Sequence, residues 1–351
     1  MKKIFVLTAL CLMALIVNAN NWRDDDTEYR VHAKKTIEKT FDVSANPELV
    51  MEGRYSDYNI TTWDQPQIDF LVKISVKGDD GKKVEAKFKS INIEFEQVGN
   101  SIIVKTEFGD YKYRSFNGSV SIKYYVKVPK DVRFDLNTVY GDITIDEVYE
   151  KLRAELKYGD FKADNIFVEE IENNSIEVKF GNIDIGNVKE MGLWLDYGDA
   201  KINTCGFIDG TLKYSKIFIT DLNSCRLELK YSDARIEKAD KVVFVNTAYS
   251  NMKIRNITDM LDVNMKYSDL TATVTSLVPK IEIEGSYSDA NLYLNEDASF
   301  NYSLHSSYGD ITFKGFFDTK SIGSRGHYGN GECGMLGISV KYGDVDIRKN
   351  K

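Results

Sequence analysis

The sequence predicts an all-β protein, folded as a single-chain parallel β-solenoid (β-helix) with coils of about 17–22 residues. The first observation behind this prediction is a recurring triplet of Tyr or Phe, then Gly or Ser, then Asp or Asn in all but one case. The triplets start at Tyr55, Phe108, Tyr140, Tyr158, Phe180, Tyr197, Tyr214, Tyr231, Tyr249, Tyr267, Tyr287, Tyr308, Tyr328 and Tyr342. A repeat of this length indicates units that bury their apolar faces on one another.

The second observation is an alternation of apolar residues whose phase changes at each triplet. With the aromatic residue numbered p, positions p−4 and p−2 are apolar before the triplet, as in Ala154 and Leu156. After it the apolar positions are p+3 and p+5, as in Phe161 and Ala163. One straight strand with such a phase change would turn its core face to solvent, so the triplet is expected to form a sharp corner. Counting alternate residues from p−2 places the aromatic side chain inward.

A third apolar position, p+8, completes the expected coil. It is occupied by Val148, Ile166, Val188, Cys205, Leu222, Ala239 and Ile257, and a short polar loop follows. Each coil is therefore expected to consist of a strand, the corner, a short strand, the apolar residue at p+8 and a polar loop. Stacked coils would pair each strand with its equivalents above and below, about 4.8 Å away.

Three regions are expected along the chain. Residues 1–19 have the form of a secretory signal peptide, with Lys2 and Lys3, an apolar run and a small-residue cleavage site ending at Ala19. The run is short for a membrane anchor, and Leu10 before Cys11 does not fit a lipid-attachment site. Residues 20–139 are expected to form an N-terminal cap with irregular first coils, and residues 140–351 the regular repeats.

Within the N-terminal region, residues 68–76 and 84–95 alternate in the manner of strands around a polar linker at 77–81. We expect them to form a β-hairpin-like insertion, with little helix anywhere in the chain. At the other end, residues 337–348 are expected to be the last coil, with the charges of residues 349–351 blunting its free edge.

The charge balance bears on partners and location. Without residues 1–19 the chain keeps 44 basic and 54 acidic residues, a net charge of −10, which argues against a nucleic-acid partner. No second apolar run long enough to span a membrane follows the signal. Export to the periplasm, the cell surface or the medium is expected.

Cys205, Cys225 and Cys333 remain after signal cleavage, and all three are expected to face inward. An odd number is not a disulfide framework, so buried free thiols are the favoured interpretation. A bridge between Cys205 and Cys225 across adjacent coils is left open.

The row of acidic residues at p+2 invites a chemical interpretation, because ten triplets carry Asp and three carry Asn. Calcium is one candidate, but one carboxylate per coil falls short of the six or more oxygens that this ion prefers. The favoured alternative is that each carboxylate accepts backbone amide hydrogen bonds at its corner while facing solvent. We therefore predict no metal and no cofactor.

No catalytic residue is predicted either. Glycosidic chemistry needs two distinguished carboxylates across a cleft, whereas the repeat supplies many equivalent ones. His305 and His327 are expected on the surface and in no catalytic motif, together with Trp194, whose exposed ring leaves glycan binding as an alternative.

The units Tyr-Gly-Asp-Ile-Thr-Ile (140–145), Tyr-Gly-Asp-Phe-Lys-Ala (158–163) and Tyr-Gly-Asp-Val-Asp-Ile (342–347) resemble a bacterial family of adhesin-like β-solenoids, a domain of unknown function found in Bacteroidetes-type genomes. The segment Asn59–Asp64 followed by residues 68–74 is similar to that family's first coil. The resemblance implies a repetitive fold and no catalytic residues. The sequence thus favours a non-enzymatic exported binding or structural protein of the cell envelope, with an unknown protein or glycan partner. The alternatives are a periplasmic scaffold or envelope-stress component and, less favoured, a polysaccharide-acting β-helix enzyme.

Overall fold

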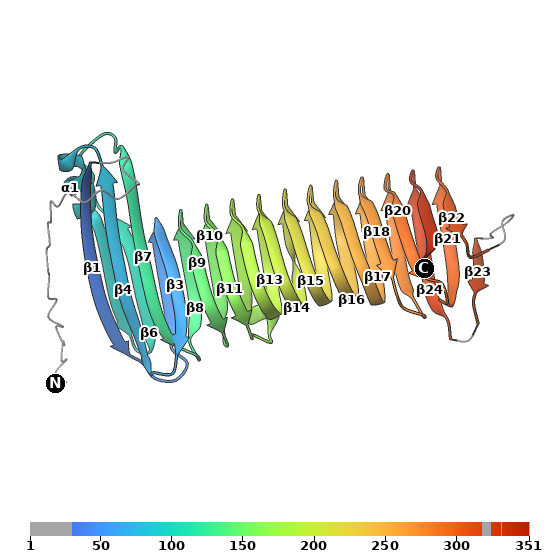
Figure 1. Cartoon of the computed structure of the whole chain (residues 1–351), viewed down its shortest axis with the longest axis horizontal. Coiled ribbons are helices and arrows are strands. Elements are labelled where there is room, and N and C mark those ends of the chain that lie inside the picture. Colours follow the sequence, from blue (N-terminus) through green and yellow to red (C-terminus); the bar gives the residue numbers. More distant parts are fainter. Residues whose placement is uncertain (1–29, 318–323, 331, 351) are drawn as a thin grey trace, which may run out of the picture.

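The protein is a long stack of β-strands with a broader group of strands at its N-terminal end (Figure 1). The computed structural model describes residues 30–317, 324–330 and 332–350. In these ranges the helical elements are α1 (Gly81–Lys89) and the single turn η1 (Ile171–Asn173), so the fold is all-β as predicted. The expected signal peptide at 1–19 lies outside the described residues. No helix among them is long and apolar enough to cross a membrane.

The strands of the N-terminal end are β1 (Val31–Asp42), β2 (Glu48–Arg54), β3 (Ser56–Trp63), β4 (Gln67–Gly78), β5 (Ile91–Val98), β6 (Ser101–Phe108) and β7 (Gly118–Pro129). The next strands along the chain are β8 (Arg133–Val139), β9 (Ile143–Val148), β10 (Leu152–Lys157), β11 (Phe161–Ile166), β12 (Asn174–Lys179), β13 (Ile183–Asp196), β14 (Asp199–Lys213), β15 (Lys216–Lys230), β16 (Asp233–Ala248) and β17 (Asn251–Lys266). The C-terminal end adds β18 (Asp269–Val274), β19 (Lys280–Ser286), β20 (Ala290–Asn295), β21 (Phe300–Ser307), β22 (Ile311–Lys314), β23 (Arg325–Tyr328), β24 (Gly334–Lys341) and β25 (Val345–Asn350).

Successive repeats pair in parallel and in register. Leu156 lies opposite Val178 before the corner, and Phe161 lies opposite Ile183 after it. The same positions pair through β13, β14 and β15, where Leu195 meets Leu212 and Ile202 meets Ile219. The phase change at the triplet is therefore present in the structure, with a pairing row on each side of it.

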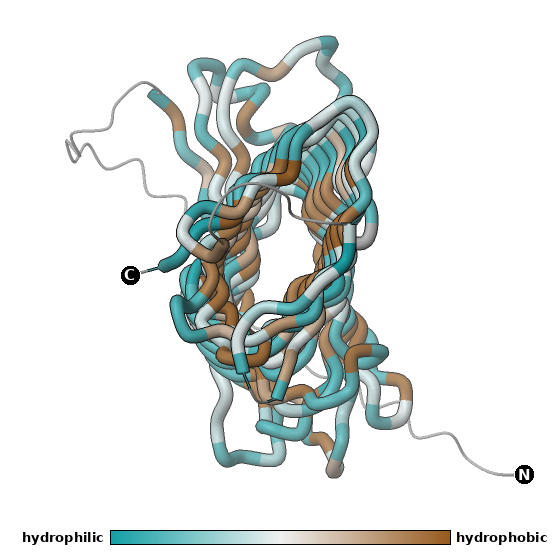
Figure 2. Tube along the Cα trace, turned by 90° about the vertical axis from the view of Figure 1, so that its right-hand side faces the viewer, coloured by the Kyte–Doolittle hydropathy of each residue, from teal (hydrophilic) through white to brown (hydrophobic). Residues whose placement is uncertain are grey.

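The core runs the length of the stack, inside the turns of the chain (Figure 2). Side chains at p−4, p−2, p+3 and p+5 line it, as shown by Ala154, Leu156, Phe161 and Ala163, each at most 3% exposed. The p+8 residues named above are buried as well. Burial of this kind, at about 25 cal/mol per Å² of apolar surface, is the main favourable term for such a fold.

The N-terminal end differs from the expected hairpin. Strand β4 pairs antiparallel with β1 and β7, and β5 pairs antiparallel with β6, so β4 and β5 do not form a hairpin. Residues 84–89 belong to α1 instead. The Asp80 side chain accepts hydrogen bonds from the amides of Lys82 and Lys83 and so caps the helix, which the alternation of Val84 to Phe95 conceals.

The C-terminal end also differs, because the chain does not stack its coils in sequence order. Strand β24 lies between β19 and β21, and β25 lies between β20 and β22. The coil of residues 337–348 is therefore interior, and the coil formed by β21 and β22 ends the stack. Strand β23 pairs antiparallel with the outer edge of β21 (Figure 1).

Candidate functional site

Twelve of the triplet aromatic residues form one continuous row, which we call the aromatic ladder. Each has a left-handed backbone conformation, with φ between 50° and 61°. In spatial order the ladder consists of Tyr55, Tyr140, Tyr158, Phe180, Tyr197, Tyr214, Tyr231, Tyr249, Tyr267, Tyr287, Tyr342 and Tyr308. Neighbouring rings are stacked with centroids 4.7–5.3 Å apart.

The ladder lies on the surface, so the prediction that these side chains point inward is wrong. From Tyr140 onward each ring is between 39% and 77% exposed. Counting alternate residues assumes extended backbone at every position, and a positive φ at p breaks that assumption. A left-handed residue other than glycine costs about 1–2 kcal/mol, and each stacked pair returns about 0.5–1.5 kcal/mol beyond its buried area.

Two triplets stand outside the ladder, and one of them covers its N-terminal end. Phe108 packs edge-on against Tyr55, with centroids 5.8 Å apart. Tyr328 lies in β23 and contacts Phe300, Phe316 and Phe317. These two triplets contain the same residue types as the other twelve, so only their place in the fold distinguishes them.

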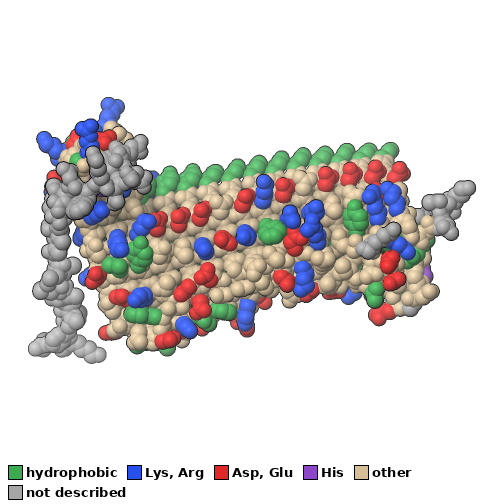
Figure 3. Space-filling view, in the orientation of Figure 1, with side chains coloured by type: hydrophobic (Ala, Val, Ile, Leu, Met, Phe, Trp, Pro, Cys, Tyr) green, Lys and Arg blue, Asp and Glu red, His purple; other side chains and the backbone are tan. Residues whose placement is uncertain are grey.

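The ladder is a ridge with different chemistry on its two sides. Figure 3 shows it as an unbroken apolar edge of the stack, with a row of acidic side chains directly beneath. On the p−1 side, Lys157, Lys266 and Lys341 place their ammonium groups 5.4–5.6 Å from ring centroids. Because the rings cover one another's faces, a partner meets ring edges along the ridge.

The acidic row at p+2 holds successive coils together. Asp142 Oδ1 accepts the amide of Asp160 at 2.9 Å, and Asp160 Oδ1 accepts the amide of Asn182 at 2.7 Å. Asp344 and Asp289 repeat the contact near the C-terminal end. The carboxylates thus accept backbone amides while exposed, as the sequence indicates, but the donor belongs to the next coil.

Serine corners use a second set of hydrogen bonds. Ser232 Oγ donates to the Lys230 carbonyl at 2.8 Å and accepts the Ser215 amide at 3.1 Å. At the corner of Lys216 the Asp233 amide donates to the Ser215 carbonyl at 3.0 Å, a main-chain bond that the Asp269 amide also makes to the Ser250 carbonyl. The one triplet without an acidic or amide residue is therefore accommodated by the main chain.

A shallow groove of about 830 Å³ runs beside the acidic row, across the coils from Phe180 to Tyr267. One wall carries p+2 side chains such as Asp199 and Asp233, and the other carries p+4 side chains such as Lys201 and Arg235. Charged groups of both signs line the groove, so it has no single charge sign. Most of its accessible lining is nevertheless apolar, so the groove does not favour a purely polar partner.

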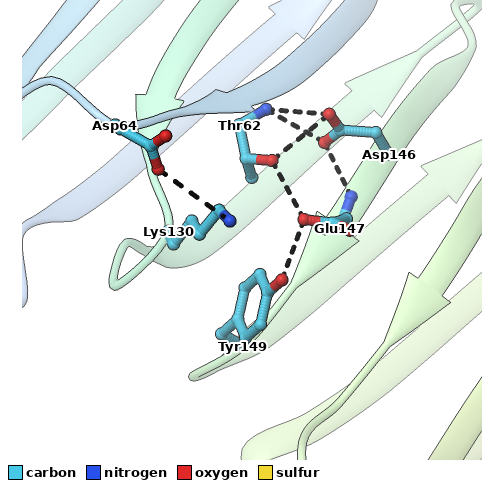
Figure 4. A network of polar contacts seen from close by, with 6 residues as sticks. All are labelled: Thr62, Asp64, Lys130, Asp146, Glu147 and Tyr149. Carbon is cyan, nitrogen blue, oxygen red and sulfur yellow. Dashed lines mark hydrogen bonds and ion pairs between the residues drawn. The ribbon is translucent and has the colours of Figure 1, made fainter.

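A polar network joins the first coil to the repeats (Figure 4). Asp146 accepts hydrogen bonds from the Thr62 amide at 3.0 Å, and Glu147 accepts from the Tyr149 hydroxyl at 2.9 Å. The hydrogen bond to Glu147 raises the pKa of the Tyr149 hydroxyl. Lys130 lies 3.9 Å from Asp64. These neighbouring acids link β3 to β9 and already have partners.

The remaining predicted residues lie apart from one another. Trp194 is 46% exposed and projects outward as expected. His305 and His327 are exposed, on β21 and β23. Cys205 and Cys225 are free and buried, in register with Leu222 and Ile208 rather than with each other, and burial raises the pKa of each thiol to about 12.

Within the described ranges no three His, Cys, Asp or Glu side chains are grouped closely enough to hold a metal ion. The Cys333 thiol is half-buried rather than enclosed, 3.5 Å from His327 Nδ1.

The family of this chain follows from a comparison with family models. The model described as Toastrack DUF4097 matches residues 64–348, which cover the ladder from Tyr140 to Tyr342. The chain belongs to the Toastrack DUF4097 family. The resemblance carried by the Tyr-Gly-Asp units is thereby confirmed. Curated proteins include no match to this Toastrack protein.

Similar solved structures come from species of Clostridium and Parabacteroides. They include a "putative cell adhesion protein" from Clostridium sporogenes, 11% identical, with a TM-score of 0.19, covering 90% of this chain and 100% of that one. A "putative adhesin" and a "putative lipid binding protein", both from Parabacteroides distasonis, are 10% and 11% identical, each with a TM-score of 0.31. They cover 89% and 90% of this chain and 97% of their own.

Proposed function

We propose that this Toastrack DUF4097 protein is a non-enzymatic exported β-solenoid of the bacterial cell envelope, and that its aromatic ladder is an adhesin-like binding surface. In this proposal residues 1–19 are removed as a signal peptide, residues 20–139 cap the solenoid, and residues 140–351 form its repeats. The parallel registers of successive coils and the closed path of the chain in Figure 2 support the solenoid assignment.

The observation that carries the proposal is the exposure of the ladder. A soluble protein rarely leaves a long continuous row of aromatic rings in solvent unless a partner uses it. Tyrosine edges and hydroxyl groups combine apolar contact with hydrogen bonding, and they are enriched at protein interfaces. The lysine row on one side and the acidic row on the other give the ridge a polarity that a partner can match.

The enzymatic alternative receives less support. Carboxylates of the acidic row are engaged with backbone amides, and Asp146 and Glu147 are engaged with Thr62 and Tyr149. A glycosidase needs one carboxyl group held as an acid and another placed across the bond from it. Turnover of any acidic or neutral polysaccharide by the purified protein would overturn the assignment.

Location is tested by protease shaving of intact cells, with osmotically opened cells as the control. Digestion on intact cells supports a surface protein and hence the adhesin-like role. Protection until the envelope is opened would instead support the periplasmic scaffold or envelope-stress alternative.

Binding through the ladder is tested with purified protein and isolated envelopes from the source bacterium. We expect the double variant Tyr214→Ala and Tyr249→Ala to bind at least about tenfold more weakly than the parent, because each truncation removes an exposed aromatic contact. Trp194→Ala, an exposed aromatic change away from the ladder, is the matched control. Equal binding by all three proteins would exclude the ladder as the binding surface.

A further inference from the structure

Where a p+2 side chain accepts the next coil's amide, a coil holds the next through four contacts at the corner. Between the coils of Tyr140 and Tyr158 the rings stack 5.0 Å apart, and the Tyr140 amide donates to the Lys157 carbonyl at 2.9 Å. The Ile143 amide donates to the Asp160 carbonyl at 2.9 Å, and Asp142 Oδ1 accepts the Asp160 amide. Two main-chain donors, one carboxylate and one ring face thus recognise the following corner.

The same four contacts bind the terminal coil, which carries Tyr308. Its ring stacks on Tyr342 at 4.8 Å, and the Tyr342 amide donates to the Ser307 carbonyl at 2.9 Å. The Val345 amide donates to the Asp310 carbonyl at 2.8 Å, while Asp344 Oδ1 accepts the Asp310 amide at 2.9 Å. On its inner side, the terminal coil therefore makes the same contacts as the other coils of this kind.

The outer side of the terminal coil displays the four groups without partners among the described residues. Tyr308 is 77% exposed, the most exposed ring of the ladder. Among the described residues, strand β22 pairs only with β25. The amides of Tyr308 and Ile311, which correspond to the two donors of the preceding corners, therefore face away from the stack. The Asp310 carboxylate is exposed and accepts no amide of a following coil.

Part of this end is covered, which leaves the open region around the corner of Tyr308. Strand β23 covers residues 300–303 of β21. Phe316 is 7% exposed, and Tyr328 packs against it with centroids 5.0 Å apart, so these rings seal the core. The opposite end of the stack has no such opening, because β6 and β7 pair with the first coil and Phe108 covers Tyr55.

We propose that the corner of Tyr308, Asp310 and β22 is a docking site for an extended polypeptide segment of a partner protein, added parallel to β22. Main-chain donors at an open strand edge select a polypeptide, as in other cases of strand addition. The Tyr308 ring and the Asp310 carboxylate favour a segment that contains its own corner, with an aromatic residue followed by Gly or Ser and then by Asp or Asn. Head-to-tail addition of a second copy does not fit, because its first coil is covered. Tyr308 is the last ring of the ladder, but this site uses its uncovered face and the edge of β22, whereas the proposed function uses the ring edges along the ridge.

The probe is a synthetic peptide with the sequence of Leu152–Ile166, labelled at its N-terminus, which contains one complete corner. Its binding to the full chain is measured by fluorescence anisotropy. The protein variants are Tyr308→Ala, which removes the ring, and Ile311→Pro, which removes the outward amide at an edge where proline is tolerated. Trp194→Ala is the matched control, and circular dichroism checks that each variant is folded.

We expect the peptide to bind saturably to the parent protein. Tyr308→Ala should weaken this binding about five- to tenfold, because one aromatic stack is lost, and Ile311→Pro should weaken it as well. Trp194→Ala should bind like the parent, and a peptide with Tyr158→Ala should bind more weakly. Absence of saturable binding, or binding equal in all variants, would overturn the proposal. Self-association of the chain that depends on Tyr308, seen by sedimentation velocity without peptide, would also overturn it by making a second copy the occupant.

Discussion

At the scale of the residue, each interior ladder position combines an unfavourable backbone conformation with favourable stacking on both ring faces. Tyr231 has φ of 52° and lies 5.0 Å from Tyr214 and 4.8 Å from Tyr249. We expect Tyr231→Ala to reduce the free energy of unfolding by about 1–3 kcal/mol, because two stacked contacts are lost and the strained backbone remains. Urea unfolding measures the change.

Tyr231→Phe is the matched control for that variant. It keeps the ring, and Phe180 already occupies an equivalent position in the ladder. A midpoint within error of the parent is expected. An equal loss in both variants would mean that the hydroxyl group, rather than stacking, stabilises the ladder.

Burial makes two of the three described thiols unreactive. Cys205 and Cys225 are at most 2% exposed and their pKa values are raised to about 12, whereas Cys333 is half-buried. Iodoacetamide at pH 8 should therefore label Cys333 in the native protein and reach the other two only after denaturation, as read by peptide mass spectrometry. Rapid native labelling of Cys205 would contradict the core position of p+8.

The same thiols predict a loss of stability at alkaline pH. Below pH 9, the ordinary thiol pKa, both are protonated in the folded and unfolded chain, so their contribution is fully present. As the pH rises from 9 towards 12 the unfolded chain ionises first, and the folded state loses stability. The double variant Cys205→Ala and Cys225→Ala should show a shallower fall over this range in urea midpoints. Parallel curves would contradict the raised pKa values.

At the scale of the element, the corner sets what each p+1 position tolerates. A Cβ on Gly159 would lie 1.9 Å from the Gly141 carbonyl oxygen, inside any permitted contact. Gly159→Ala must therefore push two coils apart, and we expect a loss of at least about 3 kcal/mol of unfolding free energy, at the upper end of single substitutions. Chemical denaturation monitored by circular dichroism tests this.

Ser232→Ala provides the comparison at a serine corner. It keeps the backbone but removes the hydrogen bonds to the Lys230 carbonyl and the Ser215 amide, which costs about 1–2 kcal/mol. A smaller loss for Gly159→Ala than for Ser232→Ala would show that the corner can open without penalty.

Elements of the repeats could be predicted because their signal is redundant. The alternation of Leu156, Ala154, Phe161 and Ala163 recurs in coil after coil, so chance matches average out. Helix α1 occurs once, in a segment where Val84 and Phe88 fit both a strand and one face of a helix. Its Asp80 cap was the available sign, and a single cap is weaker evidence than a repeated pattern.

At the scale of the whole molecule, the insertion of β24 and β25 predicts how truncation acts. Deletion of residues 334–351 removes an interior coil, so β21 and β22 lose the neighbours on which they stack. We expect residues 296–333 to become susceptible to trypsin while the repeats up to β20 stay resistant. If residues 337–348 were the terminal coil, their deletion would leave the coil before them protected. Resistance of residues 296–333 to trypsin would therefore contradict the interior position.

The sequence by itself determined the all-β fold, the corner at the twelve triplets of the ladder and the p−4, p−2, p+3 and p+5 side chains that line the core, because these depend on a local periodicity that recurs in the coils. The tertiary structure alone decided three things. It turned the aromatic residues outward, since the direction of a side chain at positive φ does not follow alternation. It placed the C-terminal coil inside the stack, since similar coils offer one another nearly equal contacts and sequence does not rank their order. It left the corner of Tyr308 open, since an edge exists only where no further strand arrives.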